Sequence, residues 1–478
     1  MADQENKPRR PFKLPSWLKG VLVAVAIVAA GGLGYALRPV LDPSVQQVPS
    51  SFTKVLATYN SIQEKYYKKT SSKTLANGAI SGMMASLGDQ FSTYLENDEK
   101  SSLDSTISAS FGGIGATVQQ TSSHLEVASL QAGSPSQKAG MKVGDQLVKV
   151  NGKSVEKSGV NAAVSKIRGK IGTTVTVTVR RDGKLLKLTM KRAKITTDTV
   201  TTSLAPADKS VGILTITSFS EPTAKQFKAG VKALRKQGAK KFIVDLRGNP
   251  GGLLEDALQI GSMGLKNGQT IVKVQDRSGA TQVYTAGKQY DHGFKVKEPL
   301  AVLIDGDSAS ASEILAGAWN ESRGVPLIGE TSYGKGTVQN VAQISKNAEV
   351  KLTVAKWLTP NGNWINKKGL APTIKTSYPA WAQIQGFSTS KMKLGDESAD
   401  VHSLQISLQA AGQTIPEANG YFGPTTQTAV KNFQTQQGLP ATGETDVATI
   451  QALIKLLSGK LAQNDNAISS AVTYLQKH

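Results

Sequence analysis

The most informative absence in this sequence is cysteine, of which the 478 residues contain none. Without cysteine the chain forms no disulfide, uses no thiolate nucleophile and holds no Cys-based zinc or iron–sulfur site. A secreted protein without disulfides is more typical of a bacterial surface than of a eukaryotic one. Histidine is also scarce, with four residues, and no set of His and Glu residues has the spacing of a metal site. The sequence therefore predicts no metal and no cofactor.

Acidic residues are in deficit, since 35 Asp and Glu face 56 Lys and Arg and leave a net charge of +21. Such an excess is typical of proteins with a polyanionic neighbour. The basic residues are scattered, and no surface rich in aromatic residues and arginine indicates a nucleic-acid module. We therefore expect anionic cell-surface polymers, and not nucleic acid, as the neighbour. The length indicates several domains, because one core rarely extends beyond about 250–300 residues.

Long apolar runs are absent except for residues 21–37, which read VLVAVAIVAAGGLGYAL and carry no charge. Their length is just enough to span a membrane. The basic residues before the run, Lys7, Arg9, Arg10, Lys13 and Lys19, predict a cytoplasmic N-terminus with the rest of the chain outside. A cleaved signal peptide is the alternative, because Ala29 and Ala30 are small enough for a cleavage site. We favour an uncleaved anchor.

After a linker, residues 52–109 repeat apolar residues at helical spacing and predict two or three helices. Residues 110–193 change to short β-type runs with glycine turns, in which the dipeptides NG and DG mark hairpins. From 194 to 380 strands alternate with amphipathic helices, which indicates a mixed α/β domain. Residues 400–457 contain three helical segments joined by glycine-bearing turns, and 458–478 form a polar helical tail.

Two of these segments resemble known modules. Residues 110–193, with FGGIG at the entry and GSPSQKAGMKVGDQLVKVNG in the centre, resemble a PDZ domain. Residues 400–457 resemble the three-helix peptidoglycan-binding module, although Asn419 stands where that family often has Asp, and Asp446 replaces a usual glycine. In a PDZ domain, backbone amides of a glycine-containing loop cradle a peptide's C-terminal carboxylate. That loop is Phe111, Gly112, Gly113, Ile114 and Gly115, with Arg168 as a second carboxylate reader or, alternatively, a solvated surface residue.

The stretch GDSASASEILAG, residues 306–317, places Ser308, Ser310 and Ser312 between a buried strand and a helix. A side chain on such a turn is exposed, and the first N–H groups of the helix are unpaired and partly positive. This is a suitable place to bind the oxyanion of an acyl-transfer reaction. The alternative is a purely structural role, because Ser310 and Glu313 also form a capping box.

A lysine is the candidate base for this serine. Lys335 stands between two glycines in TSYGKGTVQNV, and Gln339 follows four residues later. Glycine neighbours let another backbone approach, and the resulting desolvation lowers a lysine pKa from about 10.4 toward neutrality. If this stretch is a strand, the even separation puts Lys335 and Gln339 on the same face. A solvent-exposed lysine in a glycine turn is the alternative.

A third segment, VDLRGNPGGLLEDAL at 244–258, is again a strand, a glycine turn and a helix. An amide of Gly251 or Gly252 is placed to supply a second oxyanion donor. The alternative is an ordinary turn in which these glycines provide positive φ.

Together these motifs resemble the carboxyl-terminal processing proteases, which use a Ser/Lys dyad. The features that carry the resemblance are DLRGNPGG, SASASEILAGA, GETSYGKGTVQ and LTPNGNWINKKGLAPT behind a PDZ domain, with Thr373 where the family often has Asp. The resemblance implies Ser310 as nucleophile, Lys335 as general base and Gln339 as its orienting partner. It implies Ala311 and Gly251 as backbone oxyanion donors.

The predicted fold class is therefore multidomain α/β. The predicted parts are a cytoplasmic basic segment (1–20), a transmembrane anchor (21–37), a linker (38–51), a helical region (52–109), a PDZ domain (110–193), a serine protease core (194–380), a linker (381–399), a wall-binding domain (400–457) and a helical tail (458–478).

The predicted function is a membrane-anchored, extracytoplasmic serine endopeptidase that recognises protein C-termini. Its expected partners are substrate proteins, cell-wall peptidoglycan and the membrane, and the resemblance implies a homodimer through the 52–103 helices. The alternatives are a catalytically inactive wall-bound scaffold and a peptidoglycan-remodelling protein. A conventional Ser–His site using His292 is a further alternative, although that residue lies in a polar loop without an evident orienting partner.

Overall fold

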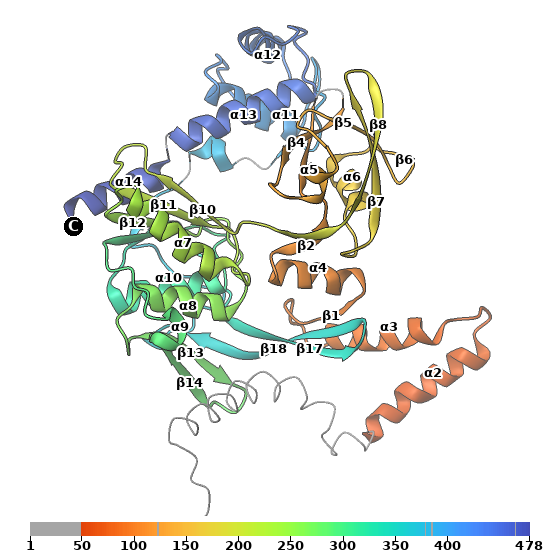
Figure 1. Cartoon of the computed structure of the whole chain (residues 1–478), viewed down its shortest axis with the longest axis vertical. Coiled ribbons are helices and arrows are strands. Elements are labelled where there is room, and N and C mark those ends of the chain that lie inside the picture. The colour runs from red at the N-terminus through yellow and green to blue at the C-terminus, as the bar shows by residue number, and fades with distance from the viewer. Residues whose placement is uncertain (1–48, 122–123, 378, 384–385, 464) are drawn as a thin grey trace, which may run out of the picture. The chain divides into compact units, whose positions relative to one another are not determined.

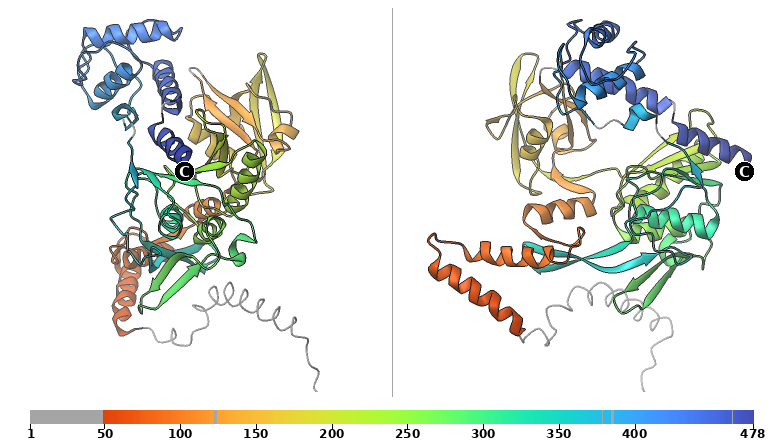
Figure 2. Two further views of the ribbon diagram at one scale, coloured as in Figure 1. Left: turned by 90° about the vertical axis from the view of Figure 1, so that its left-hand side faces the viewer. Right: turned by 180° about the vertical axis from the view of Figure 1, so that it is seen from behind.

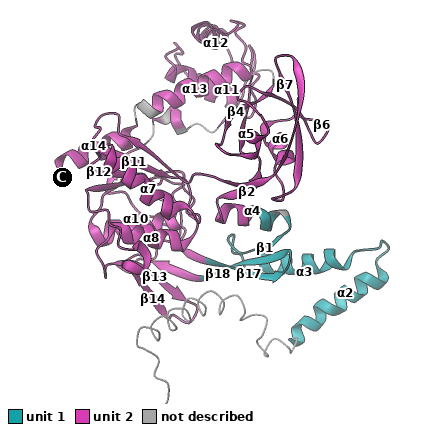
Figure 3. Ribbon diagram, viewed as in Figure 1, with its two compact units in different colours: residues 1–101, 339–354 teal, residues 102–338, 355–478 magenta. Residues whose placement is uncertain are grey.

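The computed structural model describes residues 49–478 apart from 122–123, 378, 384–385 and 464 (Figure 1). The chain divides into two compact units, shown in Figure 3: unit 1 comprises residues up to 101 with 339–354, and unit 2 comprises 102–338 with 355–478. The predicted anchor at 21–37 lies outside the described residues. Among the residues described, no helix has the length and apolar character needed to cross a membrane.

Unit 1 is a helical hairpin joined to a small antiparallel sheet. Its elements are η2 (Ser50–Phe52), α2 (Thr53–Lys65), α3 (Ser72–Ala85), β1 (Thr93–Glu96) and parts of β17 (Thr337–Ser345) and β18 (Ala348–Leu358). No residue of α2 or α3 is buried. Strand β1 is antiparallel to β18, with Thr93 opposite Lys351. The prediction of helices alone was wrong for β1, because its pairing strand lies about 250 residues further along the chain.

The PDZ-like part is a small β-sheet domain entered by α4 (Asp98–Ile107). Its elements are β2 (Ser110–Gly113), β3 (Ala116–Gln120), β4 (Leu125–Leu130), α5 (Pro135–Lys138), β5 (Gln146–Val150), β6 (Lys153–Ser154), α6 (Val160–Ile167), β7 (Thr174–Arg181), β8 (Lys184–Lys191) and β9 (Ala193–Thr196). The strand order is β3-β4-β5-β7-β8, so β3 is an edge strand, and α6 packs against it. Asn151 and Asp182 adopt positive φ before glycines, which confirms the two predicted hairpins.

The protease core is a six-stranded sheet of order β10-β11-β12-β15-β16-β19. Its strands are β10 (Val200–Leu204), β11 (Val211–Ile216), β12 (Lys241–Asp245), β15 (Leu300–Ile304), β16 (Leu327–Gly329) and β19 (Ile374–Lys375). Only the edge strand β10 is antiparallel to its neighbour. The connecting helices are α7 (Thr223–Lys236), α8 (Leu254–Gly264), α9 (Lys288–Asp291) and α10 (Ala311–Arg323), with a hairpin of β13 (Thr270–Asp276) and β14 (Thr281–Thr285) beside them.

Both faces of this sheet are covered by helices, as is usual for parallel strands. Alternate residues such as Leu214, Val244 and Val302 pack on α7, α8 and α10. The opposite residues, such as Ile213 and Leu303, pack against α14 (Asn466–Lys477) at the end of the chain. The prediction of a polar tail was therefore wrong for α14. It is amphipathic, and its apolar side completes the protease core.

The segment between β19 and α14 forms a separate helical module. It contains η3 (Ala380–Gln383), α11 (Ala399–Ala410), α12 (Pro424–Gln436) and α13 (Val447–Gln463). The helices α11, α12 and α13, in blue, lie together in every view of Figure 1 and Figure 2. They share a core that includes Leu404, Phe422 and Phe433. The three predicted helices are confirmed, but α13 continues past the predicted boundary at 457.

Candidate active site

Ser310 occupies the turn between the buried strand β15 and helix α10. It is the N-cap residue of α10 and has φ 56° and ψ −113°, a conformation that a residue with a side chain rarely adopts. Strain of this kind persists only where the surroundings fix the backbone, and it is concentrated at functional sites. Ser310 is partly exposed.

The two neighbouring serines are fully buried and hold the turn in place. The Ser308 hydroxyl donates to the Leu246 carbonyl at 2.9 Å, and the Ser312 hydroxyl donates to the Asn249 carbonyl at 2.9 Å. Both hydroxyls are thus used to attach this turn to the loop after β12. Of the three serines, Ser310 alone remains accessible.

Glycines on either side of Lys335 allow a second backbone segment to approach closely, as the sequence predicted. A Cβ on Gly334 would lie 2.8 Å from the Gly369 nitrogen, and one on Gly336 would lie 2.8 Å from the Asn366 Cβ. The indole of Trp357 donates to the Lys335 carbonyl at 2.8 Å. Lys335 itself is partly buried. These contacts fix the backbone that carries the candidate base.

The carboxylate of Glu313 joins the serine and lysine segments. One oxygen accepts the backbone N–H groups of both Ser310 and Lys335, each at 2.8 Å. The other accepts the Ser332 hydroxyl at 2.6 Å and the Gly334 N–H at 2.7 Å. Glu313 is fully buried, so these charge-assisted bonds replace its hydration. The sequence indicated its bond to Ser310 through the capping box, but not the three bonds to the lysine segment.

Lys335 and Gln339 do not share one strand, and this correction follows from where β17 begins. The strand starts at Thr337, so Lys335 lies in the irregular segment before it. Gln339 belongs to unit 1, where its side chain donates to the Thr353 hydroxyl at 3.1 Å. The same-face argument therefore does not apply to this pair, and the orienting role of Gln339 stays a prediction.

The two predicted oxyanion donors lie beside Ser310. Ala311 is the first residue of α10, where an N–H has no partner within the helix. A Cβ on Gly251 would lie 2.9 Å from both the Ala311 nitrogen and the Ser310 Cβ, and its φ is 97°. The Gly251 N–H donates to the Asn249 side chain at 2.9 Å. In this conformation its bond is to Asn249, so its role at the oxyanion stays a prediction.

The predicted carboxylate loop of the PDZ-like part is held on both sides. Strand β2 pairs with β9, and the Gly169 N–H donates to the Gly112 carbonyl at 3.0 Å. Ile114 is buried, and Gly115 has φ 75°. The exposed Arg168 guanidinium stacks 4.0 Å from the centre of the Phe111 ring. Arg168 is thus brought to the loop, although its contact there is with an aromatic ring.

His292 is exposed at the C-terminal end of α9, and in the described part of the chain its ring forms no hydrogen bond. No group of three or more His, Cys, Asp or Glu residues suited to a metal ion occurs among the residues described.

Family models match four parts of the chain in the predicted order. Residues 210–376 match peptidase family S41, and 112–191 match the PDZ domain. Residues 397–453 match a peptidoglycan-binding domain, and 40–99 match the N-terminal domain of the activating protease CtpB.

Whole-chain relatives agree with these matches. The chain is 42% identical to carboxy-terminal processing protease CtpA of Bacillus subtilis (strain 168), over 90% of this chain and 91% of CtpA. It is 33% identical to CtpB of the same strain, over 92% of this chain and 96% of CtpB. Among solved structures, a photosystem II D1 C-terminal processing protease matches with 26% identity and a TM-score of 0.41, over 69% of this chain and 94% of that one. The chain belongs to the carboxy-terminal processing proteases and is a serine-type peptidase of family S41 with a PDZ domain and a peptidoglycan-binding domain.

Proposed function

We propose that this chain is a membrane-anchored, extracytoplasmic endopeptidase that cleaves proteins presented by their C-termini, with Ser310 as nucleophile and Lys335 as general base. The observation that carries the proposal is the carboxylate of Glu313. One of its oxygens accepts the backbone N–H groups of both residues. Their main chains are therefore held at one point beside an accessible serine on a strained turn.

The proposed chemistry uses residues of this chain and one water. The neutral Lys335 amine takes the proton of the Ser310 hydroxyl as that oxygen attacks the scissile carbonyl. The Ala311 N–H and the loop of Gly251 stabilise the oxyanion. The tetrahedral intermediate collapses, the C-terminal fragment leaves with a proton from the lysine, and an acyl-enzyme remains on Ser310. A water activated by Lys335 then releases the new C-terminus, while Gln339 orients the lysine.

Substrate capture is assigned to the PDZ domain. Strand β3 is an edge strand with α6 beside it, which is the arrangement in which an extended peptide adds to a sheet. We assign the terminal carboxylate to the loop of Phe111 to Gly115 and to the Arg168 guanidinium, which contacts the Phe111 ring at 4.0 Å. Capture there raises the local concentration of a cleavable segment at the protease core.

The location is proposed from the two ends of the chain. The uncharged residues 21–37, preceded by basic residues, favour an anchor with the catalytic portion outside the cytoplasm. The peptidoglycan-binding domain and the net charge of +21 favour retention near wall polymers. Membrane fractionation checks this, since a variant lacking residues 21–37 should leave the membrane fraction.

A homodimer through unit 1 is also proposed. The hairpin of α2 and α3 holds a groove of about 860 Å³ lined mainly by apolar residues, and Val55, Leu56 and Met83 are exposed. Apolar surface left open in this way is typical of an interface. Sedimentation in detergent should give a dimer for wild type and a monomer for Leu56→Asp. The matched control is Leu185→Asp, which places the same charge on the exposed Leu185 of the PDZ sheet.

The enzymatic test uses the full chain in detergent and an unstructured reporter with an apolar C-terminus. Wild type, Ser310→Ala, Lys335→Ala and His292→Ala are compared by mass spectrometry of the products. The proposal expects the serine and lysine variants to be inactive and His292→Ala to keep the wild-type rate. Cleavage by both Ser310→Ala and Lys335→Ala would show that the nucleophile and base are other residues. An inactive wild type would favour the scaffold interpretation.

A further inference from the structure

The last helix of the chain is part of the protease core although the peptidoglycan-binding domain separates it from that core in sequence. Its buried residues Ala467, Ala471, Val472 and Leu475 form one apolar side, and that side covers β11, β12, β15 and β16. Lys241, at the start of β12, also donates to the carbonyl of Leu475. The peptidoglycan-binding domain is thus an insertion, with the protease core on both sides of it in the chain.

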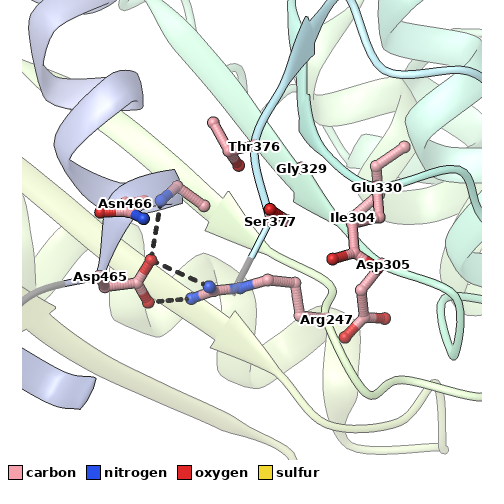
Figure 4. A pocket seen from close by; sticks show the side chains of 10 residues that line it. Arg247, Ile304, Asp305, Gly329, Glu330, Thr376, Ser377, Asp465 and Asn466 are labelled. Atoms are coloured by element: carbon pink, nitrogen blue, oxygen red, sulfur yellow. Dashed lines mark hydrogen bonds and ion pairs between the residues drawn. The ribbon is translucent and has the colours of Figure 1, made fainter. Parts of the chain in front are cut away.

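Asp465 is the N-cap residue just before this helix, and its carboxylate makes two sets of contacts. As N-cap residue, its Oδ1 accepts the backbone N–H groups of Ala467 and Ile468, both at 3.0 Å. The same carboxylate pairs with Arg247, at 3.0 Å to Nη1 and 2.7 Å to Nη2 (Figure 4). Both side chains are about nine-tenths buried. The second set of contacts is not needed for capping.

Arg247 is a buried cation that two carboxylates compensate, those of Asp465 and Asp245. The guanidinium also donates to both oxygens of Asp245, at 2.9 and 2.7 Å. Burial lowers the pKa of Arg247, but hydrogen bonds and charges of Asp245 and Asp465 outweigh it and raise the pKa above its usual value. A buried cation of this kind is stable only while its partners remain, because leaving it unpaired is costly.

Arg247 lies in the middle of the loop that supports the nucleophile turn. The preceding carbonyl, of Leu246, accepts the Ser308 hydroxyl. The next residue, Gly248, donates its N–H to both oxygens of Asp305 at 3.0 Å. The Asn249 carbonyl accepts the Ala309 N–H at 3.0 Å. A displacement of Arg247 is therefore passed directly to the residues on either side of Ser310 and to the Gly251 turn.

The space around Arg247 and Asp465 is too small for a substrate. The pocket shown in Figure 4 measures about 10 Å³, which is about the smallest space that holds a single water. Its residues come from the ends of β12, β15 and β16, from the segment after β19 and from the start of α14. The cluster thus serves as a junction between elements and not as a ligand site.

We propose that Asp465 is a positioning residue of the protease: through Arg247 it fixes the loop that holds Ser310 and the oxyanion donors in their reactive geometry. This inference rests on the proposed function of Ser310. A conformational change of the peptidoglycan-binding domain that displaces Asp465 would then reduce the reactivity of Ser310, although Asp465 and Ser310 lie far apart in sequence.

Two substitutions separate this role from helix capping. Asp465→Asn and Asp465→Ser both keep an N-cap side chain, because Asn and Ser cap about as well as Asp, but they remove the charge that faces Arg247. Val472→Ala is the matched control, since it weakens the packing of α14 on the sheet without touching Arg247. The full chain in detergent is used throughout, and thermal unfolding is recorded for each variant.

The first readout is phosphonylation of Ser310 by a small fluorophosphonate, followed by intact mass, because this probe needs the oxyanion site but not the PDZ domain. The second is kcat and KM on the reporter. We expect Asp465→Asn and Asp465→Ser to lower the phosphonylation rate and kcat about tenfold, with KM within twofold of wild type. Val472→Ala should lower the unfolding temperature and keep both rates at 25 °C.

Unchanged rates in both Asp465 variants would overturn the inference while leaving Ser310 as nucleophile. An equal loss of rate in Val472→Ala would also overturn it, since the helix would then act through stability alone. A wild-type chain that is neither phosphonylated nor active would contradict both the proposed function and this inference. Failure of both wild-type assays therefore distinguishes that outcome from failure of the inference alone.

Discussion

Replacing Glu313 with glutamine turns one buried carboxylate oxygen of the active site into an NH2 group. On the oxygen shared by Ser310 and Lys335, that NH2 would face two backbone donors. On the other oxygen it would face the Gly334 N–H and the Ser332 hydroxyl, and a hydroxyl can rotate to accept. The second orientation is therefore preferred, and it leaves the buried Gly334 N–H without a partner.

The expected energy follows from these bonds. An unsatisfied buried N–H costs about 1–3 kcal/mol, and two bonds that lose their charged acceptor weaken by about 0.5–1.5 kcal/mol each. The sum is about 2–6 kcal/mol, and it falls on the segments that carry the nucleophile and the base. Since a displacement of about 1 Å at a reacting group lowers the rate roughly 100-fold, we expect Glu313→Gln to reduce kcat by about two orders of magnitude with little change in KM.

The assay is steady-state cleavage of the C-terminal reporter, with circular dichroism to confirm folding. Glu321→Gln is the matched control, because Glu321 lies on the same helix and its carboxylate accepts from Asn361 and Asn363, away from Ser310. It should keep kcat within twofold of wild type. A Glu313→Gln enzyme as active as the control would refute the role of this carboxylate in assembling the site.

Three further outcomes are expected. Burial raises the pKa of the Asp256 carboxyl from 3.8 to about 6; the nearby Glu255 and Glu221 add a smaller increase, and the Ala224 hydrogen bond opposes it. The stability contributed by the protonated carboxyl is therefore full below about pH 4 and is lost as the pH rises through 6. Asp256→Asn should therefore increase the free energy of unfolding by up to about 3 kcal/mol at pH 7.5, seen as a higher unfolding temperature, but not at pH 4. No difference at pH 7.5 would contradict this. Leu475→Ala should destabilise the protease core by about 2–5 kcal/mol in denaturant unfolding, because Leu475 is fully buried between the sheet and α14. A change below about 1 kcal/mol would show that α14 is not part of that core. Arg168→Ala should raise KM several-fold for a reporter with a free C-terminus and not for one with an amidated C-terminus, and an equal effect on both would argue against a carboxylate contact.

Local motifs made the nucleophile region predictable from sequence. The alternating serines, the capping box and the glycines around Lys335 are each encoded within about ten residues, and the structure contains them. Hairpin dipeptides and helical periodicity likewise located the PDZ-like strands and the three helices of the peptidoglycan-binding domain, because these elements depend on short-range turn chemistry and repeat patterns.

Contacts between distant residues were not predictable in the same way. Arg247 and Asp465 are 218 residues apart, and no local sequence motif around either residue predicts its contact with the other. The buried apolar residues of α14 are Ala467, Ala471, Val472 and Leu475. Their helical spacing could have predicted an amphipathic helix, but it could not predict which sheet that helix covers. Strand β1 was missed because four residues paired with a distant strand give too short a pattern to read.

The role of Ser310 as nucleophile is tested most directly by identifying which serine reacts. The full chain is treated with a fluorophosphonate, digested and mapped by mass spectrometry, with Lys335→Ala treated in parallel. We expect an adduct on Ser310 alone in wild type and little or none in Lys335→Ala. An adduct on Ser308 or Ser312, or labelling of Ser310 at the wild-type rate without Lys335, would contradict it.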